Sequence, residues 1–351
     1  MNWDDAIDIT AKGTVLLGDE VCCDGFRRDR RWRIQSHTHK DHMGGFGSSL
    51  GRQDVLMSSA TRALLVAELN AGLETRENII PLELSKKHDL GSIAVTLESS
   101  GHTLDSAQVV VEYKDGPRLG YSGDFAWPLD NVIQLDALII DSTNGVPEAT
   151  RTISQEELEN RFMELVVSLR RSGSVTIRAH RGTAERAAAL LAQAVKEPIL
   201  IPRKSREEFE VYKAFGHPIG DTIDLESPEG QELIRKDSYV LLTSLRGRSE
   251  LFPYQVSPGA TIILSAVGLN PNAGLQENID DGRKSYQLPM SNHADFIGTI
   301  EYVKATGAKL VVTDNTEGRG NRGAELARQI KRLLGVESRP STNQSSWAWG
   351  T

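Results

Sequence analysis

Short apolar stretches with a two-residue period dominate the first 146 residues of the chain. Ile93, Val95 and Leu97 alternate with smaller or polar residues, which is typical of a half-buried strand, whereas the continuous apolar run 137–140 is typical of a strand buried on both faces. Ser59 precedes an apolar stretch with helical spacing and predicts a helix start. Further strands are predicted at 14–17, 21–23, 32–35, 55–57, 108–113 and 118–122.

The pattern changes after residue 146, where predicted strands begin to alternate with amphipathic helices. Ser154 and Glu157 form a capping box at the start of one such helix, which should end near Gly173. This alternation predicts a parallel sheet with helical crossovers. Strands are predicted at 175–178, 199–201, 239–243, 261–264 and 309–313, helices at 183–195, 205–215, 294–305 and 322–334, and a loop at 268–286.

These changes in pattern predict an α/β protein built from four segments. We expect a first domain that begins at 1–146, an inserted domain at 147–286, and a return of the chain to the first domain at 287–337. The polar segment 338–351 contains Trp347 and Trp349, and we expect it to be a flexible tail or a docking segment.

The composition is that of a globular protein, with 39% hydrophobic and 25% charged residues among 351. No apolar run is long enough to cross a bilayer, and the first five residues lack the pattern of a signal peptide, so we expect a cytoplasmic protein without a membrane partner. Cys22 and Cys23 are adjacent, which argues against a disulfide framework. The net charge of −8 argues mildly against nonspecific coating of nucleic acid.

The densest chemistry of the chain lies in residues 37–42, His-Thr-His-Lys-Asp-His, directly after a predicted strand. His37 and His39 are two residues apart and can reach one metal ion from the end of the strand, while Asp41 and His42 begin the next turn and can reach a second ion. Neutral imidazoles and carboxylates suit zinc or manganese, which acidify a bound water. The alternative is a polar loop whose histidines face water.

The pattern His-x-His-x-Asp-His resembles that of the metallo-β-lactamase fold hydrolases, and two further segments resemble the next motifs of that family. The segment 100–106, Ser-Gly-His-Thr-Leu-Asp-Ser, places His102 as the implied third histidine ligand of the first ion. The segment 121–125, Tyr-Ser-Gly-Asp-Phe, places Asp124 as the implied bridge between two ions. The resemblance implies an αββα sandwich and a site for two divalent ions, zinc or manganese.

An α/β unit inserted into such a sandwich resembles the β-CASP branch of the family, which adds further motifs. Asp141 closes a buried strand as the branch's acid does, and His293 lies in a matching Ser-Asn-His-Ala-Asp segment at 291–295. The resemblance implies that Asp41, Asp141 and His293 serve catalysis: His293 would protonate the leaving oxygen without binding metal, and Asp141 would orient a ligand histidine. The alternative is that His293 only caps a helix.

The resemblance breaks at the last motif. RNA-processing members of the branch place a metal-binding histidine there, whereas this chain has Asp314 within Val-Thr-Asp-Asn-Thr-Glu at 312–317. The DNA-repair members also lack that histidine, so the local pattern favours DNA over RNA. Asp314 either replaces the missing ligand or caps the end of a strand. The phosphate-loop pattern of the family is only partly matched by 180–186, although a helix start there would suit a phosphate.

A basic stretch with aromatic residues, 26–33, precedes the metal motif. Arg27, Arg28, Arg30 and Arg31 could contact phosphates and the aromatic rings could stack on bases, or the stretch is a solvated loop with a structural Trp32.

The sequence as a whole predicts a two-metal phosphodiesterase, most simply a nuclease with an exonuclease leaning, with DNA favoured and RNA as the alternative. Two other hypotheses are a hydrolase of a small or cyclic nucleotide, thioester or lactam on the same scaffold, and a scaffold protein without activity. The complete set of candidate ligands argues against the last.

Overall fold

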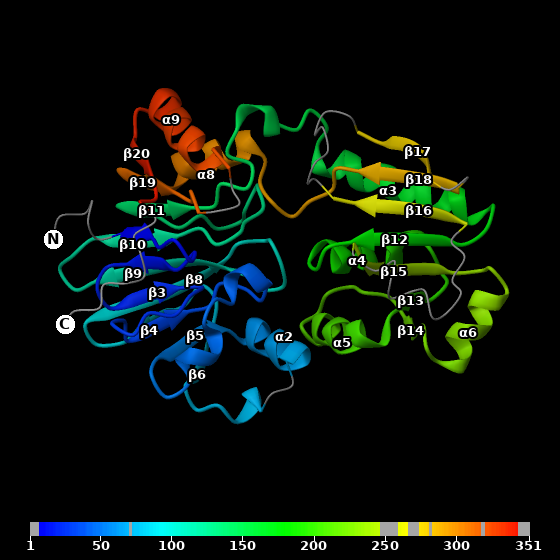
Figure 1. Ribbon diagram of the computed structural model, residues 1–351, viewed down its shortest axis with the longest axis horizontal. Coiled ribbons are helices and arrows are strands. Elements are labelled where there is room, and N and C mark those ends of the chain that lie inside the picture. Colours follow the sequence, from blue (N-terminus) through cyan, green and yellow to red (C-terminus); the bar gives the residue numbers. More distant parts are fainter. Residues whose placement is uncertain are drawn as a thin grey trace. The chain divides into compact units, whose positions relative to one another are not determined.

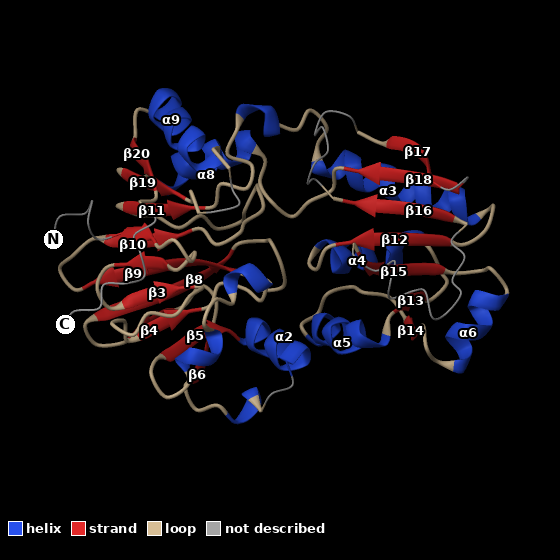
Figure 2. Cartoon of the chain, viewed as in Figure 1, coloured by secondary structure: helices blue, strands red, loops and turns tan. Residues whose placement is uncertain are grey.

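The computed structural model describes residues 7–69, 72–245, 259–265, 274–280, 283–316 and 320–342 (Figure 1). The chain divides into two compact units, the first formed by Met1–Thr150 with His293–Thr351 and the second by Arg151–Asn292. Both units contain sheets and helices, so the protein is α/β (Figure 2). No helix in these described ranges is long and apolar enough to span a bilayer.

The first unit contains two sheets that pack face to face. Alternate residues of their strands, such as Leu56 and Ile139, meet in one buried apolar core between the sheets. One sheet has the order β1 (Ile7–Ile9), β2 (Val15–Leu17), β3 (Val21–Cys23), β4 (Trp32–Ile34), β5 (Asp54–Ser58) and β6 (Ile79–Leu82). The other has the order β20 (Glu337–Pro340), β19 (Leu310–Thr313), β11 (Ala137–Ile140), β10 (Arg118–Tyr121), β9 (Ala107–Tyr113), β8 (Ile93–Ser99) and β7 (Lys87–Asp89).

Helices cover the outer faces of both sheets. Leu65 of α2 (Ser59–Leu69) packs on Val55 and Met57 of β5, which point away from the central core. Helices α8 (Phe296–Thr306) and α9 (Arg322–Leu334) bury their apolar side chains against the outer residues of β11 and β19. The layers therefore follow the order helix, sheet, sheet, helix.

The second unit is a single sheet with helical crossovers. Six strands run parallel, and β17 pairs antiparallel at one edge. The order is β14 (Thr222–Asp224), β13 (Ile199–Ile201), β15 (Val240–Ser244), β12 (Val175–Ala179), β16 (Ala260–Leu264), β18 (Arg283–Leu288) and β17 (Gln276–Asp280). In the described part of this unit the helices are α3 (Gln155–Arg170), α4 (Thr183–Ala194), α5 (Arg206–Ala214) and α6 (Pro228–Arg235). Ser154 caps α3 by accepting a hydrogen bond from the Glu157 backbone, as the sequence predicts.

Several expectations about short strands were wrong. The predicted loop 268–286 contains β17 and most of β18 in its described part, and β20 occupies the start of the predicted flexible tail. Strands β17 and β20 are rich in polar residues and have no apolar pattern that would predict them. They form because neighbouring strands supply their hydrogen bonds, and β18 likewise pairs in parallel with β16. Trp347 and Trp349 lie outside the described residues.

Glu185 in the first turn of α4 is a buried acid in the second unit. It accepts a hydrogen bond from the backbone N–H of Gly182, and burial together with the nearby Glu208 carboxylate raises the pKa of Glu185 to about 8. The folded state therefore holds a proton that the unfolded chain releases above about pH 4.3, and stability should fall as the pH rises from there to about 8.

We expect Glu185→Gln to remove this loss, because the amide oxygen still accepts from Gly182 and no proton is needed. Thermal unfolding should show similar melting temperatures for variant and parent at pH 5, and a variant that melts several degrees higher at pH 9. Glu164→Gln, on the exposed side of α3, is the control. Equal pH dependence in the parent and Glu185→Gln would contradict the prediction.

Candidate metal centre

The candidate site lies in the first unit, at strand ends brought together by pairing. Strands β3, β4 and β5 run parallel to one another in one sheet, as do β10, β11 and β19 in the other, so each set presents its carboxyl ends on one edge. The site residues follow these ends or lie in the loop after β8: His37, His39, Asp41 and His42 after β4, His102 after β8, Asp124 after β10, Asp141 after β11 and Asp314 after β19.

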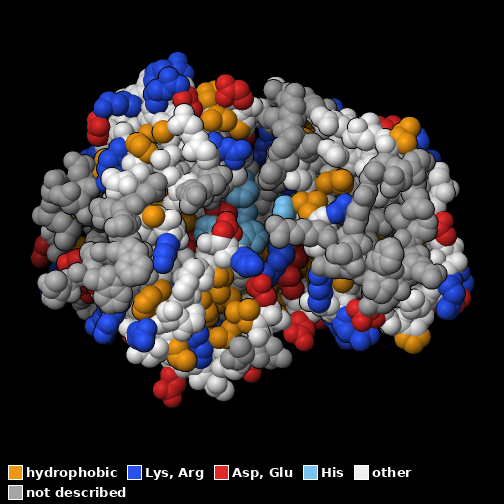
Figure 3. All heavy atoms as spheres, in the orientation of Figure 1, with side chains coloured by type: hydrophobic (Ala, Val, Ile, Leu, Met, Phe, Trp, Pro, Cys, Tyr) orange, Lys and Arg blue, Asp and Glu red, His pale blue; other side chains and the backbone are white. Residues whose placement is uncertain are grey.

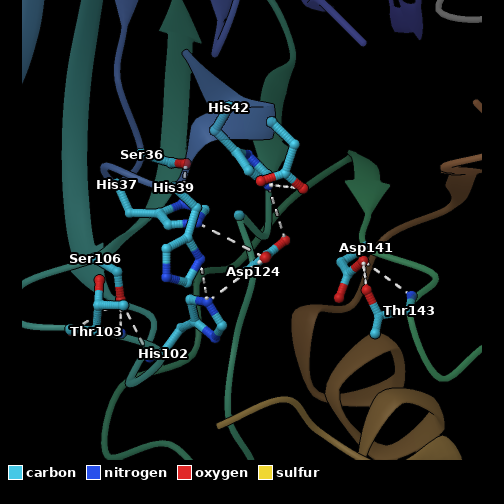
Figure 4. Close-up of polar contacts among 12 residues, drawn as sticks. Ser36, His37, His39, His42, His102, Thr103, Ser106, Asp124, Asp141 and Thr143 are labelled. Carbon is cyan, nitrogen blue, oxygen red and sulfur yellow. Dashed lines mark hydrogen bonds and ion pairs between the residues drawn. The ribbon is translucent and has the colours of Figure 1, made fainter. Parts of the chain in front are cut away.

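Four of the predicted ligands form one compact cluster (Figure 4). His37, His39, His102 and Asp124 each offer an atom within 4.8 Å of the others. The planes of the three imidazoles lie at 79° to 89° to one another, and His39 Nδ1 is 3.1 Å from His102 Nε2. Three imidazoles with one carboxylate are a donor set that suits a zinc-type ion.

The electrostatics of this cluster also suit a cation. Burial lowers the pKa of His37 well below its usual range, and burial with the neighbouring His102 lowers the pKa of His39 to about 3. Both rings are therefore neutral near pH 7 and keep a lone pair for a metal. Among the described residues, His37 Nε2 and Asp124 Oδ1 are buried without a hydrogen-bond partner, which a bound ion would remedy.

His42 lies beside the other carboxylate oxygen of Asp124, and Asp41 lies beside His42. His42 Nε2 is 3.4 Å from Asp124 Oδ1 and 3.7 Å from Asp41 Oδ2, and the Asp41 side chain is 72% exposed. Burial disfavours the charged form of His42, but Asp124 and Asp24 outweigh it and raise its pKa well above the usual value. Burial opposes the charge of Asp124, but His42 and then His293 outweigh it and lower the pKa of Asp124 well below its usual range. His42 therefore favours its charged form between the carboxylates of Asp24 and Asp124 when no metal is bound.

Asp24 is not among the site residues predicted from the sequence, and it contacts the Nδ1 side of the His42 ring. Asp24 follows β3, and its Oδ2 lies 2.8 Å from His42 Nδ1, while its Oδ1 accepts from the Ser36 backbone at 2.8 Å. By accepting the Nδ1 proton, Asp24 orients the ring so that Nε2 can bind a metal ion that displaces the second proton. The available signal was an acid at the end of a predicted strand, the same pattern that singled out Asp141.

Asp141 contacts His293. Its Oδ2 is 3.2 Å from His293 Nδ1, and His293 Nε2 is 3.8 Å from Asp124 Oδ2. His293 lies at hydrogen-bonding distance from Asp141, and the expectation that Asp141 orients a metal-ligand histidine stays a prediction. The His293 side chain is 21% exposed and lies with its ring 4.5 Å from that of His102. Asp124, Asp141 and His293 also form a group that could hold an ion.

Asp314 lines a cavity at this site, but its carboxylate accepts hydrogen bonds from Thr316. The cavity has a volume of about 300 Å³, and Asp41, His42, Asp124, Asp141 and Asp314 line it with Tyr121 and the β1–β2 hairpin. Asp314 Oδ1 accepts hydrogen bonds from the backbone and hydroxyl of Thr316, as Asp141 Oδ1 does from Thr143. No metal-binding group within the described ranges includes Asp314. This geometry favours the strand-end cap over direct ligation, and ligation by Asp314 stays a prediction.

The basic stretch 26–33 differs from the expected stacking surface. Trp32 is 5% exposed and belongs to the core between the sheets, and Arg33 is fully buried, so neither can contact a base. Arg27 and Arg30 are both paired with Asp29. Arg28 and Arg31 are exposed and remain candidate phosphate contacts.

The space-filling view shows histidine side chains at the surface, beside acidic side chains (Figure 3).

Comparisons with known proteins leave the family open. No protein-family model matches the chain. A probable DNA ligase from Opitutus terrae is 22% identical over 287 residues, which are 79% of this chain but 26% of the ligase, so the chain spans about a quarter of that relative. An uncharacterized protein in the lig 3′ region of Acidianus ambivalens is 29% identical over 125 residues, 35% of this chain and 89% of that protein. The crystal structure of a protein of unknown function from Enterococcus faecalis matches with a TM-score of 0.61 and 14% identity over 91% of this chain and 82% of that one, a likeness of fold alone.

Proposed function

We propose that the protein is a metal-dependent phosphodiesterase that cuts nucleic acid, built as a metallo-β-lactamase sandwich with an inserted β-CASP-like domain. The observation that carries this proposal is the buried cluster of His37, His39, His102 and Asp124, with His42 beside it and His293 at its edge. Such a donor set suits zinc, with manganese as the alternative.

The residues divide into two groups by what they do. His37, His39, His102 and Asp124 would hold the first ion, and Asp41, His42 and Asp124 the second. When bound, the two ions supply an acidified water and offset the negative charge that gathers on the phosphoryl oxygens.

His293 then serves the leaving group. Its Nδ1 faces Asp141, so the carboxylate accepts that proton and directs Nε2 toward the cluster. A proton on Nε2 can pass to the departing oxygen of the cleaved ester, which would otherwise leave as an alkoxide. Asp141 acts through His293 and is a positioning residue.

DNA is the substrate class that we propose. The absence of a histidine at the position of Asp314 favours DNA by resemblance, and the relative from Opitutus terrae is named a probable DNA ligase. A nuclease that trims ends before they are joined would fit such a relative. RNA is the alternative.

The 300 Å³ cavity favours a second candidate, the hydrolysis of a small or cyclic nucleotide. A cavity of this size lies at the low end of small-molecule sites. An acidic lining disfavours a free phosphate until cations neutralise Asp41 and Asp124, so this candidate also requires metal.

The test is cleavage of end-labelled single- and double-stranded DNA and RNA, with cyclic nucleotides in parallel, by protein loaded with Zn²⁺ or Mn²⁺. We expect DNA to be shortened from an end, and chelation to abolish the reaction. Cleavage of cyclic nucleotides without cleavage of polymers would favour the second candidate. A metal-loaded protein that cuts none of these substrates would refute the proposed activity.

A further inference from the structure

Two polar residues that precede the histidine segment are fully buried: Arg33 in β4 and Gln35 directly after this strand. Trp32 and Ile34 point into the core between the sheets, so Arg33 and Gln35 point to the opposite side, and both have no exposed surface. A buried guanidinium is rare because desolvation opposes its charge, and burial indeed lowers the pKa of Arg33. Such a residue needs an explanation beyond packing.

Arg33 and Gln35 donate to the backbone of the loop that carries the ligands. Arg33 Nη1 donates to Gly44 O at 2.9 Å and Nη2 to His42 O at 3.4 Å. Gln35 Nε2 donates to His37 O at 2.7 Å and to His42 O at 3.0 Å. These carbonyls lie at both ends of the ligand segment 37–42 and just beyond it. The two side chains therefore hold the loop against the end of β4.

Arg33 also sets the orientation of the Gln35 amide. A guanidinium has only donors, and Arg33 Nη2 donates to Gln35 Oε1 at 2.7 Å. The amide oxygen must therefore face Arg33, and the NH₂ group must face the loop carbonyls and Asp24, whose Oδ1 it reaches at 3.2 Å. Asp24 in turn contacts His42 Nδ1 at 2.8 Å. One chain of contacts thus runs from Arg33 through Gln35 and Asp24 to His42.

We propose that Arg33 and Gln35 are positioning residues of the metal centre: they hold the ligand loop closed and, through Asp24, keep His42 with Nε2 directed at Asp124. The inference rests on the proposed metal binding. Its consequence is that the second ion, which depends on His42 and the exposed Asp41, binds more weakly when these buried contacts are broken.

The test is titration of metal-free protein with Co²⁺, followed by the visible absorption of the ion, which reports coordination geometry without any substrate. Gln35→Glu keeps the shape and the acceptor for Arg33 but replaces the NH₂ donors with an oxygen facing Asp24 and two carbonyls. Arg33→Met removes the guanidinium at similar length. We expect each variant to bind the second Co²⁺ about 10- to 100-fold more weakly, with an altered spectrum, the range typical for lost partners of metal ligands.

Arg76→Met is the matched control. Arg76 lies over the Phe46 ring at 5.0 Å, as Arg33 does at 5.2 Å, but it donates to Asn78 instead of the ligand loop. It should bind Co²⁺ as the parent does. Asp24→Asn is the milder variant if the others do not fold, since it leaves Arg33 and Gln35 in place and should weaken the second ion alone by about tenfold.

The outcomes separate the two proposals. Parent protein that takes up no Co²⁺ would refute the proposed metal-dependent function itself. Parent protein that binds two ions, with Gln35→Glu, Arg33→Met or Asp24→Asn binding them at parental affinity and with the parental spectrum, would overturn the positioning role alone.

Discussion

Asp124→Ala should leave the purified protein with almost no tightly bound metal, because the Asp124 carboxylate stands between the three-histidine cluster and His42. His39→Ala should lose mainly the first ion, since His39 contributes to that cluster alone. Elemental analysis after dialysis measures both, and we expect affinity losses of at least about a hundredfold, because even outer partners of metal ligands are worth about 10- to 100-fold.

His88→Ala is the control for these variants. His88 is half-buried in the same unit, on β7, with its ring at 3.2 Å from the Glu83 carbonyl. It should retain the parental metal content. Unchanged metal content in both His39→Ala and Asp124→Ala would rule out the proposed two-metal centre.

His293→Ala should keep its metal and lose about two to four powers of ten in kcat, the usual contribution of a general acid. The loss should depend on the leaving group. A phosphodiester with a p-nitrophenol leaving group needs no proton on departure, so its hydrolysis should be largely spared. Rates on DNA and on that ester, measured on protein of verified metal content, give the comparison.

Asp141→Asn tests the same assignment from the other side. The amide cannot accept the Nδ1 proton as the carboxylate does, so His293 loses its fixed orientation, and kcat on DNA should fall while KM changes little. If His293→Ala cuts DNA at the parental rate, the general-acid role is ruled out. If His293→Ala loses metal, His293 is a metal ligand, as its group with Asp124 and Asp141 allows.

The sequence by itself determined the elements with a strong local signal. The helix predicted at 322–334 and the strand predicted at 199–201 appear at those residues as α9 and β13. Apolar periodicity and caps lie within the segment they describe, so no tertiary information is needed to read them. The spacing of His37, His39 and His42 is also local, because a strand end followed by one turn fixes their relative directions.

Only the tertiary structure decided which distant residues meet at the site. Asp24 reaches His42 because β3 and β4 pair in parallel, and Asp141 reaches His293 across 152 residues of sequence. The same holds for the basic stretch, in which packing between the sheets removes Trp32 from the surface and Asp29 engages two of the arginines. Strands such as β17 and β20 exist because a neighbour supplies their hydrogen bonds. Pairing and burial are properties of the whole chain, and a pattern read along a segment cannot contain them.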